Sequence, residues 1–189
     1  MSLSPAIHSF EEGSVFNEDV KIIYRDYGPK DAEPILLVQG LGGQLINWPD
    51  HLIDFLISNN FRPIVFDNRD TGLSSRLTDD RFAEGNRSKT INSTYLKYYF
   101  RLPINPPYTL DDMASDAILI LDKLDIDKTH LLGMSMGGMI AQIIAANHPE
   151  RINSFTLIAS SISAPSPLNG PTRDVRRLLM KRSANPYST

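Results

Sequence analysis

The 189-residue chain contains no cysteine and only four histidines. Without cysteine the chain has no disulfide bonds, no thiolate-ligated metal site and no cysteine nucleophile. The histidines do not follow the spacing of metal ligands; they are His8, His51, His130 and His148. These residues therefore give no sign of a metal site, and the sequence implies no organic cofactor.

The chain also lacks an excess of charge, with 19 basic and 22 acidic side chains and a net charge of −3. Nucleic-acid-binding proteins usually carry a strongly basic face, so no nucleic-acid partner is expected. The first residues contain no basic stretch followed by an apolar core, which argues against a signal peptide. The most apolar window, residues 131–146, is too short and too interrupted to span a bilayer. We expect a soluble, cytoplasmic protein without a membrane partner.

Strand-like and helix-like hydrophobic patterns alternate along the chain. Residues 14–27 alternate apolar and polar around a turn, which predicts a β-hairpin. Apolar runs predict buried strands at residues 34–39, 61–66, 129–134 and 151–159. Helical spacing predicts helices at residues 49–59, 109–124 and 136–147. Strands that alternate with helices after an antiparallel start predict an α/β fold with a doubly wound, mostly parallel sheet.

Two segments do not follow these periods. Residues 68–108 are polar and then aromatic, with a cluster at Tyr95, Tyr98, Tyr99 and Phe100. Such a stretch is typical of a binding wall or lid, and a short helix packed on the core is the alternative. Residues 161–189 are rich in proline, serine and arginine. The predicted division is an incomplete core at residues 1–160 and the start of a lid or cap at 161–189.

Glycines follow the first buried run, in the stretch Gln39-Gly40-Leu41-Gly42-Gly43. A dinucleotide-binding loop would need a further glycine at position 45, where this chain has leucine. A phosphate-binding loop would need a Gly-Lys-Ser/Thr sequence, and none follows any of the glycine-containing corners. Both nucleotide interpretations are therefore disfavoured.

Acidic residues follow the second buried run, in Asp67-Asn68-Arg69-Asp70. Asp67 and Asp70 could act as paired carboxylates. The favoured interpretation is that they cap the loop and pair with Arg69, because loops after strands are polar by default.

A serine stands between glycines after the third run, in the pattern Gly133-x-Ser135-x-Gly137. Chance alone gives such a pattern in about one chain of this size in fifteen. Here a predicted strand precedes the serine and a predicted helix follows it, which is the context of a nucleophile elbow. Glycines would remove clashes at the strained corner, and we predict that Ser135 is a nucleophile.

Backbone N–H groups near this serine could stabilise an oxyanion. The predicted helix begins at Met136 and directs its free N–H groups and positive dipole end toward Ser135. The Met136 N–H would stabilise a tetrahedral oxyanion, and a second donor must come from a neighbouring loop. Leu41, in the first glycine-rich corner, is placed to supply it.

Together these segments resemble the α/β-hydrolase fold family over nearly the whole chain. QGLGGQLINW is similar to the family's oxyanion loop, and HLLGMSMGGMIAQIIAANHPERI to its elbow and helix. DNRDTGLSS and YTLDDMASDAILILDKL resemble small bacterial esterases of the aclacinomycin methylesterase type. The resemblance implies a serine hydrolase acting on a small-molecule ester, with Ser135 as nucleophile and Leu41 and Met136 as oxyanion donors.

Two departures from the family pattern stand out. Gln39 occupies a position where the family often has histidine. After the serine, where the family has its acid and histidine, the one histidine is His148, about 18 Å away along the predicted helix. Asp174 lies in the lid segment. We therefore expect the catalytic Asp and His beyond the end of the chain, and the loss of a serine's base reduces turnover on the order of a million-fold.

The remaining expectations concern association and other functions. The strand at 151–159 should be an exposed apolar edge, through which copies of the chain could pair as a homo-oligomer. A non-catalytic protein of the same fold that binds a ligand or partner is the alternative function. Cofactor-free haloperoxidase activity would use the same serine site.

Overall fold

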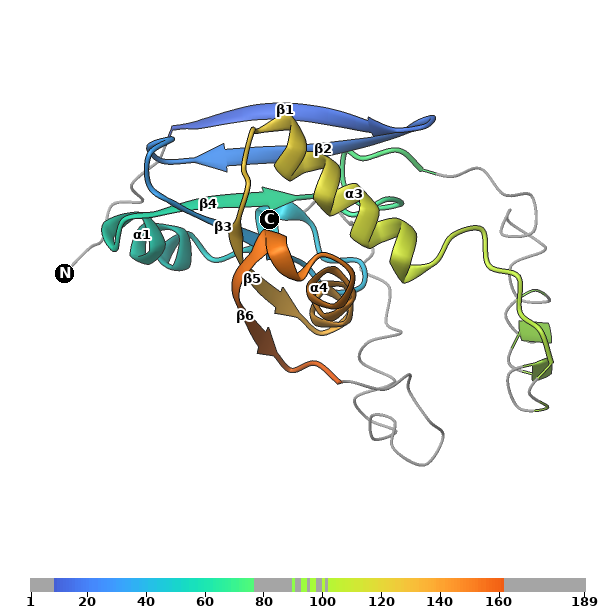
Figure 1. Cartoon of the computed structure of the whole chain (residues 1–189). Helices are drawn as coiled ribbons and strands as arrows, with labels where there is room; N and C mark the ends of the chain where they lie inside the picture. Colours follow the sequence, from blue (N-terminus) through green and yellow to red (C-terminus); the bar gives the residue numbers. More distant parts are fainter. Residues whose placement is uncertain are drawn as a thin grey trace.

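The computed structural model describes residues 9–76, 90, 93–94, 96–97, 100 and 102–161, and the structural statements below concern these residues. Their core is a six-stranded sheet in the order β1-β2-β4-β3-β5-β6 (Figure 1). The strands are β1 (Phe10–Asn17), β2 (Val20–Tyr27), β3 (Glu33–Val38), β4 (Phe61–Phe66), β5 (Thr129–Met134) and β6 (Ile152–Ile158). β1, β2 and β4 pair antiparallel, and β4, β3, β5 and β6 pair parallel. The predicted mostly parallel sheet with an antiparallel start is confirmed.

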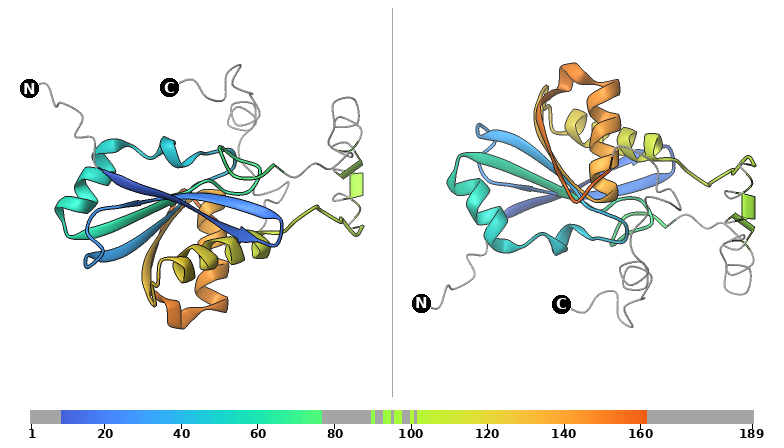
Figure 2. Two further views of the ribbon diagram at one scale, coloured as in Figure 1. Left: turned by 90° about the horizontal axis from the view of Figure 1, so that it is seen from above. Right: turned by 90° about the horizontal axis from the view of Figure 1, so that it is seen from below.

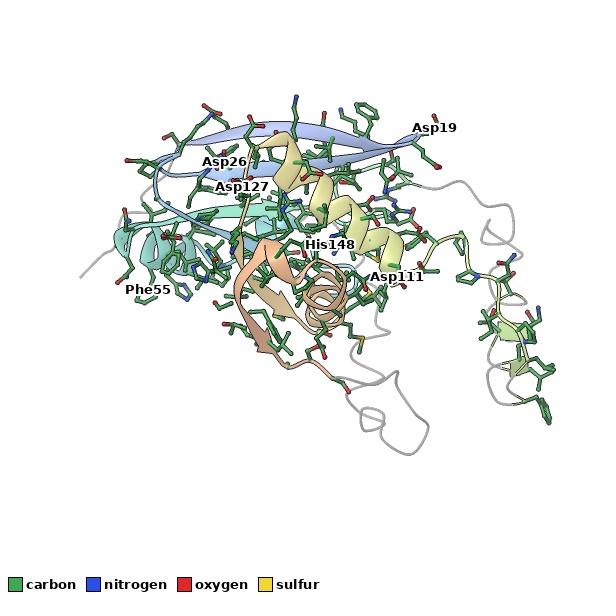
Figure 3. All side chains as sticks on the ribbon, in the orientation of Figure 1. Asp19, Asp26, Phe55, Asp111, Asp127 and His148 are labelled. Carbon is green, nitrogen blue, oxygen red and sulfur yellow. The ribbon has the colours of Figure 1, made fainter. Side chains whose placement is uncertain are left out.

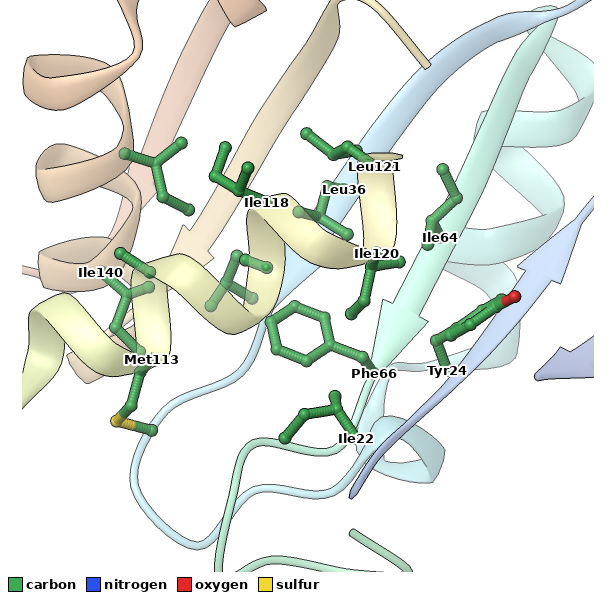
Figure 4. Close-up of a cluster of buried hydrophobic side chains, with 14 of the residues drawn as sticks. Ile22, Tyr24, Leu36, Ile64, Phe66, Met113, Ile118, Ile120, Leu121 and Ile140 are labelled. Atoms are coloured by element: carbon green, nitrogen blue, oxygen red, sulfur yellow. The ribbon is translucent and has the colours of Figure 1, made fainter. Parts of the chain in front are cut away.

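Helices cover both faces of this sheet, as the views from above and below show (Figure 2). The helices are η1 (Leu45–Asn47), α1 (Asp50–Ser58), α3 (Leu110–Lys123), α4 (Met136–Asn147) and η3 (Pro149–Arg151). One apolar cluster joins α3 and α4 to the sheet around Phe66 and Ile120, both fully buried (Figure 4). A second cluster joins α1 and η1 to the opposite face around Leu37 and Trp48. The fold is therefore doubly wound, with a separate core on each face.

Local sequence signals explain most element boundaries. The strands at 61–66 and 129–134 and the helix at 136–147 lie at their predicted bounds. α3 begins after Thr109, whose hydroxyl accepts the Asp112 N–H while the Asp112 carboxylate accepts the Thr109 N–H. This reciprocal capping box satisfies two backbone N–H groups that a helix start leaves free.

The hairpin is longer than predicted, because β1 begins at Phe10 rather than at residue 14. The Phe10 ring packs on Tyr27 at a centroid distance of 5.3 Å, and the Arg25 guanidinium donates to Glu12 at 3.0 Å. These contacts across the strands stabilise a segment whose own sequence does not alternate.

β6 forms one edge of the sheet (Figure 1). Among the described strands it pairs with β5 alone, and it exposes the large apolar side chains Phe155, Leu157 and Ile158. The expectation of an exposed apolar edge is thus met within this part of the chain.

Several predictions fall outside the described residues. Three of the four clustered aromatic residues do so, whereas the fourth, Phe100, is exposed. The lid segment lies outside from residue 162 onward, so the division at residue 160 stays a prediction. In the part that is described, no helix is long and apolar enough to cross a membrane.

Candidate functional site

Ser135 stands on a sharp corner between β5 and α4, with its side chain exposed. Its backbone has φ 54° and ψ −119°, a conformation that residues other than glycine rarely adopt. Such a conformation costs about 1–3 kcal/mol. The corner is held by neighbours: the Ser135 N–H donates to Ile158 O at 2.9 Å, and Ser160 Oγ donates to Ser135 O at 2.9 Å. A strained and exposed serine is therefore fixed in one position.

The glycines around this corner are required by packing. A Cβ on Gly133 would lie 2.6 Å from Gly137 O, and a Cβ on Gly137 would collide with Val38 O. In both cases the obstructing atom is backbone, which cannot rotate away as a side chain does. The predicted reason for the glycines, removal of clashes across the corner, agrees with this geometry.

The glycine-rich loop after β3 lies directly against the serine. A Cβ built on Gly40 would be 3.1 Å from Ser135 Cβ and 3.6 Å from Ser135 Oγ. The Gly43 N–H donates to Gly40 O at 3.0 Å, and Gly42 has φ 73°, so the loop turns sharply around Leu41. Leu41 is 85 % exposed at the tip of this turn.

Three sequence-predicted site residues thus come together. Met136 is the first residue of α4 and follows Ser135 directly, so its N–H is one of the free donors at the helix start. Leu41 follows Gly40, where an added Cβ would lie 3.1 Å from Ser135 Cβ. The structure places both near the serine, at the edge where the parallel strands end; such edges are where ligands bind in open α/β sheets.

The loop after β4 is held by Asp67, whose carboxylate is buried. Its Oδ1 accepts the Leu45 N–H at 2.7 Å and its Oδ2 accepts the Leu73 N–H at 2.9 Å. Burial raises the pKa of Asp67, and the two N–H donors oppose that rise without cancelling it. Asp67 therefore caps its loop, as the favoured interpretation held.

Arg69 has a different partner from the predicted one. Its guanidinium makes a bidentate pair with Asp116 of α3 at 2.7 and 2.6 Å, and both side chains are buried. Asp70 instead bonds Tyr108; burial, together with that bond, raises the pKa of Tyr108 to about 12. The predicted pairing of Arg69 with its neighbouring carboxylates is wrong because the fold brings a distant helix closer.

Sequence reasoning also missed Asp116 and Ser160. Asp116 lies three residues after Met113 and four before Ile120, both buried, so it is a carboxylate on an apolar helix face. Such a position is a signal for a buried partner. Ser160, after β6, carries no comparable signal.

None of the histidines that the structure describes is placed as a base for Ser135. His148 caps the far end of α4 and lies 3.8 Å from Glu150 (Figure 3). His130 points to Ser154 on β6, with 2.7 Å between Nδ1 and Oγ. His51 lies on α1, which packs on the other face of the sheet from α4. The described residues also contain no group of three potential metal ligands.

The arrangement of sheet, corner and loops defines a hydrolase-type α/β fold, and comparison with known proteins agrees. Residues 33–185 match the alpha/beta hydrolase fold family. The chain therefore belongs to the alpha/beta hydrolase fold family.

Two relatives of the chain are named methylesterases. Rhodomycin D methylesterase DnrP of Streptomyces peucetius is 29 % identical over 144 residues, which cover 76 % of this chain and 40 % of that protein. Rhodomycin D methylesterase DauP of Streptomyces sp. (strain C5) is 33 % identical over 130 residues, which cover 69 % of this chain and 35 % of that protein. The crystal structure of a hydrolase from Pseudomonas aeruginosa PA01 superimposes with a TM-score of 0.62 and 25 % identity. The superposition covers 82 % of this chain and 48 % of the hydrolase. The chain thus spans less than half the length of each.

Proposed function

We propose that this chain carries the nucleophile and the oxyanion loop of a serine hydrolase that cleaves a carboxylic ester through an acyl-enzyme on Ser135. The observation that carries the proposal is the exposed Ser135 at φ 54°, beside Gly40, where an added Cβ would lie 3.1 Å from Ser135 Cβ. An exposed residue in a costly conformation needs a reason, and catalysis is the usual one at such a corner.

The chemistry follows from the neighbours of the serine. Ser135 Oγ attacks the carbonyl carbon of the ester while a histidine accepts its proton. Charge develops on the carbonyl oxygen, where the N–H groups of Leu41 and Met136 donate to it. Collapse of the tetrahedral intermediate breaks the bond to the alcohol, which leaves with the proton from the histidine. Water then attacks the acyl-enzyme, and the carboxylic acid is released.

The histidine and its acid are expected from polypeptide beyond Thr189. The support is positional: His148 is at the far end of α4, His130 contacts Ser154, and His51 is exposed on α1, which packs on the other face of the sheet. The relatives extend well past the matched segment, since the chain covers 40 % of one methylesterase and 35 % of the other. We expect the 189 residues alone to be nearly inactive, because loss of the base costs on the order of a million-fold.

An ester substrate is the chemistry that the relatives favour, because DnrP and DauP are both named methylesterases. A non-catalytic protein that uses the same corner to bind a ligand is the alternative. It is favoured by the lack of a base near the serine in the described part of the chain. This alternative does not explain the strained conformation of Ser135, and we therefore rank it second.

Covalent labelling separates these two functions. The complete product of the reading frame would be treated with a fluorophosphonate, and the modified peptide identified by mass spectrometry. We expect one adduct, on Ser135, and none on the Ser135→Ala variant. Ser115→Ala, which changes an exposed serine on α3, should label like the wild type. A folded complete product without a Ser135 adduct would favour the binding protein. Reading the coding sequence past codon 189 tests whether an Asp and a His follow.

We further propose that copies of the 189-residue chain associate through β6. The support is the exposure of three large apolar side chains on this edge strand, Phe155, Leu157 and Ile158. An unpaired apolar edge is a template for another strand. Light scattering at high concentration should show dimers or larger species, and Leu157→Lys should shift them toward monomer. A monomer at all concentrations would contradict this.

A further inference from the structure

The loop that carries Leu41 is attached at both of its ends. It runs from Gln39, directly after β3, to Leu45, the first residue of η1. Between these two residues the chain passes Ser135 at Gly40 and turns at Gly42. The position of the Leu41 N–H relative to the serine therefore depends on what fixes the two ends.

Asn68 fixes the first end. Its Nδ2 donates to Gln39 O at 3.1 Å, and Asn68 and Gln39 are 2 % and 1 % exposed. The orientation of the amide follows from this contact, since a carbonyl oxygen accepts from the amide nitrogen and would repel the amide oxygen. This interaction joins the loop after β4 to the peptide that immediately precedes Gly40.

Asp67, the neighbour of Asn68, fixes the second end. Its Oδ1 accepts the Leu45 N–H at 2.7 Å. Bonds from charged acceptors to backbone N–H groups are among the stronger hydrogen bonds in proteins. Two consecutive side chains thus hold both ends of the same loop.

The residues that hold the loop are themselves fixed. The Asp67 N–H donates to Ile23 O at 3.0 Å, which anchors it to β2. Ser74 Oγ donates to Asp67 O at 2.6 Å. The next residue, Arg69, is locked to α3 by its bidentate pair with Asp116. Asn68 and Asp67 therefore form a rigid support.

We propose that Asn68 is a positioning residue for the oxyanion hole: through Gln39 O it sets where the Leu41 N–H lies relative to Ser135, and Asp67 supports the other end of the loop. The inference rests on the proposed serine hydrolase function. A polar side chain that only satisfied a buried carbonyl would contribute to stability alone. A positioning residue must also change the rate of the step in which charge develops on the oxyanion.

Thr129, the first residue of β5, provides a control that also contacts the β3 segment. Its Oγ1 lies within hydrogen-bond distance of two carbonyl oxygens, Pro34 O at 3.1 Å and His130 O at 2.9 Å, and the residue is fully buried. Asn68 and Thr129 thus each support a carbonyl of the β3 segment, at opposite ends. Thr129→Val removes a buried bond without touching the loop at Ser135, so it reports what lost stability alone does.

The test compares Asn68→Ala with Thr129→Val in the complete product of the reading frame. Hydrogen exchange of the peptide over residues 40–45 should become at least tenfold faster in Asn68→Ala and remain unchanged in Thr129→Val. Hydrolysis of a p-nitrophenyl ester should lose about 10–100-fold in kcat with little change in KM, because removal of an oxyanion donor costs about 10²–10³. If Asn68→Ala does not fold, Asn68→Asp carries the same prediction, since its carboxylate has no N–H to donate.

The outcomes separate the inference from the proposed function. Faster exchange with a fall in kcat beyond that of Thr129→Val supports the positioning role. Unchanged exchange overturns it, and so does faster exchange with an unchanged kcat. If wild type and Ser135→Ala hydrolyse the ester equally, the proposed function fails, and the positioning role fails with it. The comparison of wild type with Ser135→Ala therefore comes before the Asn68 variants.

Discussion

Two loops at the carboxyl edge of the sheet are held in opposite ways. The corner at Ser135 is tightly packed because Gly133 and Gly137 have no side chains, so that neighbouring backbone atoms lie close to them. The loop after β4 is held by buried polar side chains, with Asp67 and Arg69 each bonded to distant elements. The first loop should not tolerate an added atom, and the second should not tolerate a removed hydrogen bond.

The largest effect is expected at Gly137, where an added Cβ would collide with Val38 O and lie 2.6 Å from Gln39 O. We expect Gly137→Ala to lose about 3 kcal/mol or more of unfolding free energy, or to fail to fold, because both obstructing atoms are backbone. Gly42→Ala is the control: no atom lies within 4 Å of its Cβ, and only its φ of +73° opposes a side chain, at about 1–2 kcal/mol. Urea unfolding measures both, and equal losses would contradict a packing origin.

An effect of similar size is expected at the buried pair of Arg69 and Asp116. Asp116→Ala leaves the guanidinium buried without its carboxylate, which should cost about 3–5 kcal/mol in urea unfolding. The double variant Arg69→Met/Asp116→Leu should recover most of that loss, because it removes both charges. A double variant as unstable as the single one would show that specific hydrogen bonds, including that from Asn17, carry the stability.

The sequence predicted the Ser135 corner better than the loop after β4, and the reason is physical. A strand, a serine between glycines and a helix are consecutive residues, so local signals suffice to predict the corner. The partner of Arg69 is Asp116, 47 residues later, and no local signal specifies that pair. Likewise the start of β1 at Phe10 depends on the contact with Tyr27 across the hairpin.

The candidate site divides in the same way. Ser135, Leu41 and Met136 could be proposed from sequence because glycine patterns mark their corners. The supporting contacts could not: Asn68 reaches Gln39 O across 29 residues, and Ser160 reaches Ser135 O across 25. The roles of the three predicted residues await the labelling and kinetic tests above.

A smaller effect should appear as a pH dependence at Asp67. Burial raises the pKa of this carboxyl in the folded protein. Its contribution to stability is therefore fully present below the unfolded pKa, about 3.9, and is lost as pH rises through the folded pKa. The unfolding free energy of wild type should fall relative to that of Asp67→Asn as pH rises through that window. A wild type that gains stability relative to the variant with rising pH in urea titrations would show that the N–H donors of Leu45 and Leu73 outweigh burial.

The smallest effect should be at the N-terminal cap of α3, where the hydrogen bonds between Thr109 and Asp112 are exposed. Thr109→Ala removes the hydroxyl that accepts the Asp112 N–H and should cost about 1 kcal/mol. The backbone N–H of Thr109, together with its hydroxyl, lowers the pKa of Asp112, the opposite direction to Asp67. The contribution of Asp112 is thus present above its unfolded pKa and lost as pH falls through the folded pKa. As pH rises, the unfolding free energy of Asp112→Asn should therefore fall relative to wild type, while that of Asp67→Asn should rise relative to wild type. If both variants followed the same pH trend, the contrast between a buried and an exposed carboxylate would fail.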